Sequence, residues 1–166
     1  MKECSKCKEV KKLSEFRKRP TRKIGLQSQC KKCQALNKRN YYKTKEGKLI
    51  LIYGNQLKSS KRRGYEPPNY TSYEFINRFI NDKDYLNIHS KWVDSGYLKD
   101  LSPSFDRKDD YKPYSFDNLN KWMTWKENNN KAFLDTKEGR LNKRSKAVKG
   151  TNVNTEKVID FHSMQE

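Results

Sequence analysis

The chain has 166 residues, of which 33% are hydrophobic, 35% are charged and 12% are aromatic. A mean hydropathy of -1.23 excludes one large apolar core, and no apolar run approaches the length that a bilayer span requires. The aromatic content, with 10 Tyr, 7 Phe and 3 Trp, is too high for a simply disordered chain. We therefore expect small cores that need additional support.

The net charge of +18 is concentrated in the N-terminal part of the chain. Residues 1–63 contain 21 Lys or Arg and 4 Asp or Glu, whereas residues 64–166 contain 17 and 16. So basic a segment is typical of a nucleic-acid partner. The alternatives are a solvated face or a patch for an anionic membrane. The first ten residues have no apolar stretch of the kind found in signal peptides, so we expect a soluble, intracellular protein without a membrane partner.

Four cysteines form two Cys-x-x-Cys pairs near the N-terminus. Cys4 and Cys7 make the first pair, and Cys30 and Cys33 make the second after 22 intervening residues. This spacing predicts a tetrahedral Cys4 zinc site, in which Zn2+ would contribute folding energy. The alternatives are two disulfides or reactive thiols, which are unusual in a cytosolic chain.

Helices are predicted on both sides of Gly47. Residues 34–47 contain no Pro or Gly before Gly47 and predict a helix that follows the second cysteine pair. A loop knuckle, a short hairpin and a knuckle that opens a helix are the outline of a treble-clef-like zinc finger. Residues 45–63 predict a second, linking helix, and Pro67 and Pro68 predict a break that we take as the domain boundary.

The basic segment supplies the predicted contacts to duplex DNA. Its most basic stretch lies between the two cysteine pairs, at residues 17–25, and we expect this tip to meet phosphates. The candidate DNA-binding residues are Arg17, Lys18, Arg19, Arg22, Lys23, Lys31, Lys32, Lys38, Arg39, Lys61, Arg62 and Arg63.

Two further helices are predicted before residue 100. Residues 71–82 begin with a Thr-Ser cap and place Tyr73, Ile76, Phe79 and Ile80 at helical spacing, which indicates a core face. Residues 85–101 predict a short helix that ends near Gly96. This segment contains His89, which we expect to be structural or exposed more than catalytic.

Residues 103–130 predict a strand, a polar turn, a second strand and a helix. Thr124 and Glu127 form an approximate capping box at the start of that helix. In a hairpin packed on a helix, Asp106 and one Asn of residues 128–130 could face one cation. Carboxylate and amide oxygens suit a hard divalent ion such as Mg2+.

The stretch from Asp106 to Asn128 resembles the ββα-metal core of HNH-type nucleases, in particular phage homing endonucleases. The family pattern has an Asp-His pair and then Asn-Leu-x-Trp-x-Thr-x-x-x-Asn; here "DRKD" and "NLNKWMTWKEN" stand in its place, with one extra residue between Leu119 and Trp122. The resemblance implies that Asp106 and Asn128 bind a catalytic Mg2+ or Mn2+, and that Asn118 holds the connecting loop. Asn129 and Asn130 are the substitutes for Asn128.

Arg107 stands where that family has its general-base His. A guanidinium stays protonated and cannot accept a proton from water, so we expect a forked contact to the scissile phosphate instead. Activation of the water is then left to the metal, to the substrate phosphate or to a distant group such as His89.

Two flanking segments extend the resemblance. Residues 1–63 look like the zinc module that precedes nuclease cores in many phage proteins. Residues 147–166 are similar to the start of a truncated nuclease-associated modular DNA-binding repeat, in which a hairpin around residues 152–161 leads into a helix; the alternative is a flexible tail. The nuclease domain would then span residues 64–146, with its core at 103–133.

The sequence thus predicts a small, irregular α+β fold made of a treble-clef-like Cys4 finger, a linking helix, further helices and a ββα-metal core. The predicted function is a metal-dependent DNA endonuclease with structural Zn2+ and catalytic Mg2+ or Mn2+. We expect a monomer that acts on double-stranded DNA in the cytoplasm of a bacterial host. The alternatives are a zinc-containing DNA-binding regulator with an inactive core, and an RNA-binding or RNA-processing protein.

Overall fold

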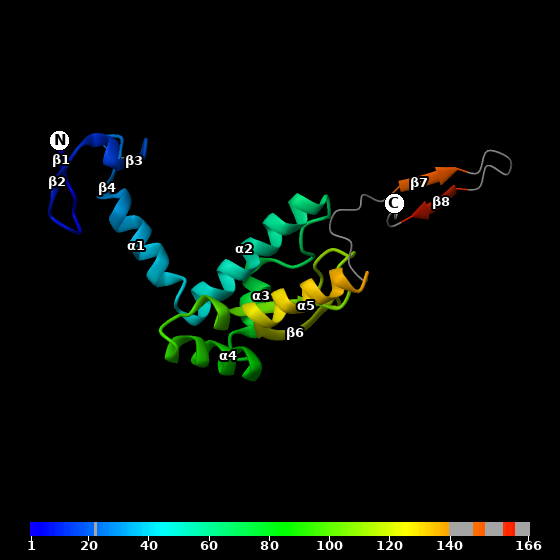
Figure 1. The fold of residues 1–166 in the computed structure, drawn as a ribbon. Coiled ribbons are helices and arrows are strands. Elements are labelled where there is room, and N and C mark those ends of the chain that lie inside the picture. Colours follow the sequence, from blue (N-terminus) through cyan, green and yellow to red (C-terminus); the bar gives the residue numbers. More distant parts are fainter. Residues whose placement is uncertain (22, 140–147, 152–157, 162–166) are drawn as a thin grey trace.

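The computed structural model describes residues 1–21, 23–139, 148–151 and 158–161. In these residues the chain is a small mixed α+β protein with five α-helices and four two-stranded antiparallel sheets. Figure 1 shows the N-terminal sheets at one end of the molecule, joined through α1 to a larger unit that contains the other helices. None of the helices in the described residues has the length and apolar composition that crossing a lipid bilayer requires.

The N-terminal module consists of two small hairpins. Its elements are β1 (Lys2–Glu3), β2 (Val10–Lys11), the short helix η1 (Leu13–Glu15), β3 (Phe16–Lys18) and β4 (Leu26–Cys30). The buried side chains are Phe16 and three of the four cysteines. So small a cluster buries little apolar surface, which fits the expectation that this module needs support beyond a core.

The first helix is shorter than the sequence predicted. Helix α1 (Lys31–Tyr41) ends six residues before Gly47, and α2 (Lys45–Arg63) begins after Thr44, whose hydroxyl accepts a hydrogen bond from the Gly47 backbone N–H at 3.1 Å. Because Thr44 caps a new helix, α1 does not continue toward Gly47. A Cβ atom at residue 47 would lie 2.0 Å from the Tyr41 carbonyl oxygen, so only glycine fits this corner. The extent of α2 is as predicted.

The next two helices occur where they were predicted. Helix α3 (Ser72–Phe79) has a complete capping box from Thr71 and Glu74, and α4 (Lys83–Asp94) stops just before Gly96, which has a positive φ of 71°. The core face predicted for α3 is wrong at one position. Tyr73 is 71% exposed, and Phe75 is fully buried in its place.

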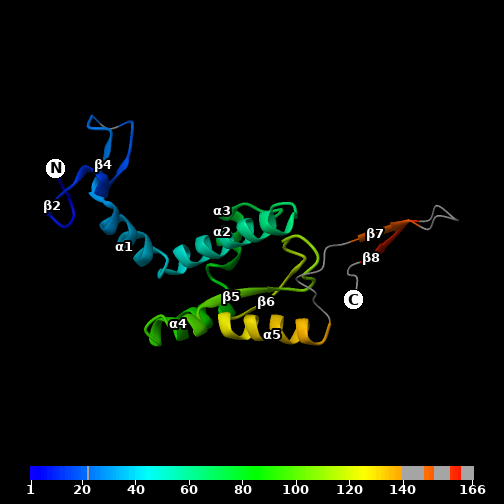
Figure 2. The same cartoon turned by 45° about the horizontal axis from the view of Figure 1, so that its top comes forward.

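A strand–strand–helix unit follows, in the order that the sequence predicted. Strand β5 (Pro103–Arg107) pairs antiparallel with β6 (Leu119–Thr124), and α5 (Trp125–Lys137) begins with a capping box from Thr124 and Glu127. A second short helix, η2 (Lys99–Leu101), precedes β5. Figure 2 shows the β5–β6 hairpin lying between α5 on one side and α2 with α3 on the other.

One hydrophobic core joins α2 to this unit. Leu49 and Ile52 of α2 are buried together with Phe75 of α3, Tyr85 of α4 and Trp122 of β6. The break at residues 64–70 ends a helix as predicted, but it does not separate two cores. Helix α2 therefore packs with the C-terminal unit, and the predicted boundary between residues 63 and 64 does not coincide with a boundary in the packing.

The C-terminal part is described only for β7 (Val148–Thr151) and β8 (Val158–Phe161), which pair antiparallel. This pairing is the arrangement expected of a hairpin. The predicted helix after it falls on residues 162–166, outside the described residues. That this tail is the start of a DNA-binding repeat stays a prediction.

Candidate functional site

The four cysteines come together as the sequence predicted. Cys4 follows β1 and Cys7 lies in the turn before β2, while Cys30 ends β4 and Cys33 lies in the first turn of α1. Their Sγ atoms all lie within 4.8 Å of one another. Two knuckles and four convergent sulfur atoms form a donor set compatible with tetrahedral Zn2+.

The backbone around the cysteines favours a thiolate at one of them. The Cys30 N–H donates to Cys4 Sγ at 3.2 Å, and such bonds lower the pKa of Cys4 to about 6. Burial and the neighbouring thiols raise the pKa of Cys33 to about 12. Thiolates that lie this close also repel one another, so all four do not ionise without a counter-charge. A divalent cation offsets that repulsion and allows all four to ionise.

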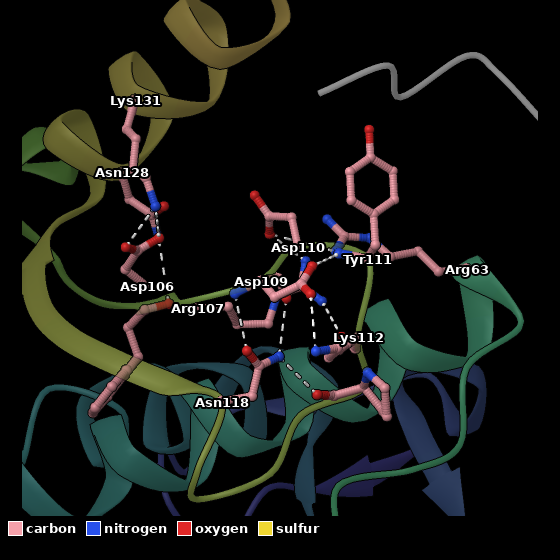
Figure 3. Close-up of polar contacts among 12 residues, drawn as sticks. Arg63, Asp106, Arg107, Asp109, Asp110, Tyr111, Lys112, Asn118, Asn128 and Lys131 are labelled. Carbon is pink, nitrogen blue, oxygen red and sulfur yellow. Dashed lines mark hydrogen bonds and ion pairs between the residues drawn. The ribbon is translucent and has the colours of Figure 1, made fainter. Parts of the chain in front are cut away.

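Asp106 on β5 is only 4% exposed, and its carboxylate forms an ion pair with Lys131. The Lys131 ammonium on α5 donates to Asp106 Oδ2 at 2.7 Å and to Oδ1 at 2.9 Å. Asn120 Nδ2 donates to Oδ2 from the neighbouring strand at 2.9 Å. Figure 3 shows Asp106 facing Lys131 and Asn128. The hairpin and the helix thus meet at this carboxylate.

An irregular register in the hairpin accounts for the position of Asn120. Phe105 pairs with Trp122 and Arg107 pairs with Leu119, so β6 has one residue more than β5 in this interval. This β-bulge is the extra residue that the sequence showed between Leu119 and Trp122. β-Bulges change the direction of side chains and are common next to active sites. Here the bulge lies opposite Asp106.

Asn128 is the member of the asparagine triplet that is best placed beside Asp106. Its Nδ2 atom donates to Ser104 Oγ at 2.8 Å and to the Phe105 carbonyl at 3.4 Å, and its Oδ1 atom has no hydrogen-bond partner among the described residues. Asn129 also lines the cavity in front of Asp106, whereas Asn130 is exposed and does not line it.

The cavity in front of Asp106 has a volume of about 330 Å³. Asp106 and Asn128 line it from β5 and α5, and Arg62 and Arg63 line it from the end of α2. Two carboxylate oxygens, one free amide oxygen and two guanidinium groups therefore converge on one opening. This composition suits a divalent cation together with a phosphate group.

Arg107 is buried and holds the loop after β5. Its Nη1 atom donates to the Lys112 carbonyl at 2.9 Å, and its Nη2 atom donates to Asp110 Oδ1 at 2.5 Å. The guanidinium also lies 4.7 Å from the centre of the Tyr114 ring. Arg107 does line the cavity, but both Nη groups are engaged by the loop. Each of these two bonds uses one of the five N–H donors of the guanidinium. The forked contact to a phosphate therefore stays a prediction.

Asn118 holds the same loop by hydrogen bonds, as expected. Its Oδ1 atom accepts from the Asp109 N–H at 2.9 Å, and its Nδ2 atom donates to the carbonyls of Asp109 and Pro113. Asp109 is a turn residue, since its carboxylate accepts from the Tyr111 N–H, and this bond lowers the pKa of Asp109. Figure 3 shows these contacts around the loop.

His89 belongs to the core and not to the cavity of Asp106. It is 4% exposed, its Nε2 atom lies 3.1 Å from the Lys43 carbonyl, and its ring lies against Tyr85 and Trp92. Burial lowers the pKa of His89, so the ring is neutral at pH 7. The structure thus places this histidine in a structural role.

The described members of the predicted DNA-binding set are all exposed. Those between the cysteine pairs lie on β3 and in the β3–β4 loop, and others lie along α1 and at the end of α2. Arg22 lies outside the described residues. Of the set, Arg62 and Arg63 line the cavity in front of Asp106, which links the basic segment to that site.

Three residues of the site were not identified from the sequence. Lys131 follows Asn128 by three residues and so shares its face of α5, a spacing that could have indicated it. The position of Asn120 depends on the β-bulge, which the extra residue between Leu119 and Trp122 could have indicated. Asp110 accepts from Arg107, lies 3.9 Å from Arg63 and lines the cavity.

Comparison with family models, with curated proteins and with solved structures finds no match to this chain.

Proposed function

We propose that this protein is a metal-dependent DNA endonuclease that hydrolyses a phosphodiester at Asp106. The observation that carries the proposal is a carboxylate that is 4% exposed and lies beside Asn128 at a cavity lined by two arginines. The order of elements, strand–strand–helix with a capping box at Thr124, is that of the HNH-type nucleases that the sequence resembles.

The residues present fit a hard divalent cation. The Asp106 carboxylate forms an ion pair with the ammonium of Lys131, and this supports the proposal that positive charge is stabilised at that position. The Asn128 Oδ1 atom is the second donor. Lys131 is 38% exposed, so its flexible chain can move into solvent when a cation binds. When bound, Mg2+ or Mn2+ stabilises the charge that develops on the phosphate and the leaving oxygen.

The chain itself supplies positioning and positive charge. Arg62 and Arg63 reach the cavity from α2, and each guanidinium can make a forked contact with phosphate oxygens. Arg107 and Asn118 keep the loop between β5 and β6 in place. No histidine lines the described part of the cavity. We assign the phosphate contact expected of Arg107 to Arg62 and Arg63, because Arg107 already binds the loop whereas these two side chains are exposed at the cavity.

In this proposal the zinc module contributes more to the affinity for duplex DNA than to the hydrolysis of the phosphodiester. Its exposed Lys and Arg side chains lie on β3 and α1, where phosphate contacts fix the position of a duplex without reading bases. Binding should therefore weaken steeply with salt.

Nicking of a supercoiled plasmid tests this function. Zinc-loaded protein is incubated with plasmid in the presence and in the absence of added Mg2+, without a chelator, so that the structural metal stays bound. We expect relaxed or linear plasmid only with Mg2+. Tight binding without cutting would support the rival regulator, and preferential competition by a structured RNA would support the RNA-binding rival.

A further inference from the structure

A second cavity, of about 540 Å³, lies where α1, α2 and α4 meet, and its lining is strongly basic. None of the described residues that line it is acidic. Its cationic residues are Arg17, Lys38, Arg39, Lys43, Lys48 and Lys99. So many positive charges around one hollow repel one another, and an anion is the natural counter-charge.

Lys48 is the most unusual of these cations because it is only 6% exposed. Its ammonium contacts the Ser102 hydroxyl at 2.5 Å and lies 4.7 Å from the centre of the Trp92 ring. Neither partner carries a negative charge, and burial lowers the pKa of Lys48 to about 8. A buried ammonium without a carboxylate is costly, and a bound anion would offset that cost.

Aromatic rings form the other wall of this cavity. The Lys43 ammonium lies 4.0 Å from the centre of the Tyr97 ring, and Tyr97 packs edge-on against Trp92 at 5.1 Å. Tyr42 of the α1–α2 corner also lines the cavity. Clustered cations of this kind are typical of surfaces that contact the phosphates of nucleic acids, and here the rings hold the ammonium groups by cation–π contacts.

A third hollow, of about 650 Å³, lies between this cavity and the cavity of Asp106. It shares Lys48 and Ser102 with the basic cavity, and it shares Arg62 and Asn128 with the cavity of Asp106. The three hollows are therefore neighbours along α2. A strand whose phosphate lies at Asp106 would pass Lys48 if it followed α2.

We propose that the basic cavity between α1, α2 and α4 is a second binding site for the DNA backbone, where Lys43, Lys48 and Lys99 hold a phosphodiester of the duplex that is cut at Asp106. This inference rests on the proposed function, and it assigns contacts that the basic segment alone did not indicate. Lys43 lies between α1 and α2, and Lys99 begins η2, so the site lies between the helix that follows the zinc module and the proposed nuclease unit.

The test is the salt dependence of binding to a fluorescent DNA duplex, measured by anisotropy without added Mg2+. Each lost phosphate contact should reduce the slope of log affinity against log salt by about 0.9. Lys48→Met preserves the packing of the apolar stem, and Lys83→Met on α4 is the control, since Lys83 is exposed and lines none of the three cavities. Raising the salt from about 50 mM to about 200 mM should weaken DNA binding by both variants. The fold-loss of affinity should be about threefold smaller for Lys48→Met than for the Lys83→Met control.

Further variants keep the inference falsifiable. Lys43→Met with Lys99→Met changes more exposed positions and avoids any folding defect at Lys48; it should reduce the slope by about 1.8. A slope equal to that of Lys83→Met in both proteins would overturn the inference, as would a change seen with an RNA hairpin and not with the DNA duplex. If the slopes change as expected but the wild type never nicks a plasmid, the DNA contact stands and the nuclease function fails. If nicking occurs and the slopes do not change, only this inference fails.

Discussion

Replacing Lys131 by methionine should strengthen the binding of divalent cations at Asp106. The Lys131 ammonium makes two contacts of 2.7 Å and 2.9 Å to a carboxylate that is 4% exposed, so a metal ion must displace it. Lys131 is 38% exposed, which limits the strength of the pair to about 1 kcal/mol. Removing that competitor should tighten binding by a factor of about five. Lys131→Met should then have the lower dissociation constant for Mn2+.

The same substitution should destabilise the metal-free protein. Among the described residues, the Asp106 carboxylate then keeps only the hydrogen bond from Asn120, at 2.9 Å, and an uncompensated buried charge is costly. We expect a loss of about 1 kcal/mol of unfolding free energy, since the exposure of Lys131 limits the pair to that strength. Saturating Mn2+ should restore the melting temperature, because a ligand that binds only the native state stabilises it.

Isothermal titration with Mn2+ and thermal melts of zinc-loaded protein provide the measurements. Lys137→Met is the control, because Lys137 is an exposed lysine on the same helix and its loss changes the net charge equally. Mn2+ affinity that is unchanged or weaker in Lys131→Met than in this control would refute the reasoning. It would mean that the ammonium does not occupy a metal position.

Other predictions concern the fold around the sites. Cys30→Ser should abolish binding of one Zn2+ per chain and unfold the N-terminal module, measured by metal analysis and hydrogen exchange; zinc retained at one per chain would contradict it. Gly47→Ala should lower the unfolding free energy by about 1 to 3 kcal/mol in urea melts, because the new Cβ would lie 2.0 Å from the Tyr41 carbonyl oxygen. The control Gly54→Ala, with open space around it, should gain up to about 1 kcal/mol. Burial lowers the pKa of His89, so the unfolded chain binds more protons and stability should fall as pH drops below 6.5; this acid loss should be smaller in His89→Gln, and equal melts would contradict it.

Local signals predicted the elements well because they act within a few residues. The capping box of Thr124 and Glu127 fixed the start of α5, and the two Cys-x-x-Cys pairs fixed the cysteine cluster. Competition between local signals was harder to judge. Thr44 caps α2 and so ends α1 at Tyr41, although the sequence between them is compatible with a continuous helix.

Long-range packing set the features that the sequence did not predict. Helical spacing within α3 was recognised, but which side faces the core depends on α2 and the hairpin, and this choice buried Phe75 and exposed Tyr73. Likewise, Asp106 was predicted as a ligand, while its pairing with Lys131 depends on how α5 lies on β5. The orientation of the Arg107 side chain depends on the loop after β5, where the Lys112 carbonyl and the Asp110 carboxylate accept hydrogen bonds from the guanidinium.

The most direct test of the central claim is the rate of plasmid nicking by Asp106→Asn compared with wild type, under saturating Mg2+ and with DNA affinity measured in parallel. The exchange keeps the shape of the side chain and removes the negative charge that we propose holds the cation. We predict a rate at least about a hundredfold lower with unchanged DNA affinity, because the cation supplies several kcal/mol of transition-state stabilisation. Asp94→Asn, at an exposed position on α4, should cut like the wild type. Nicking by Asp106→Asn at the wild-type rate would contradict the account.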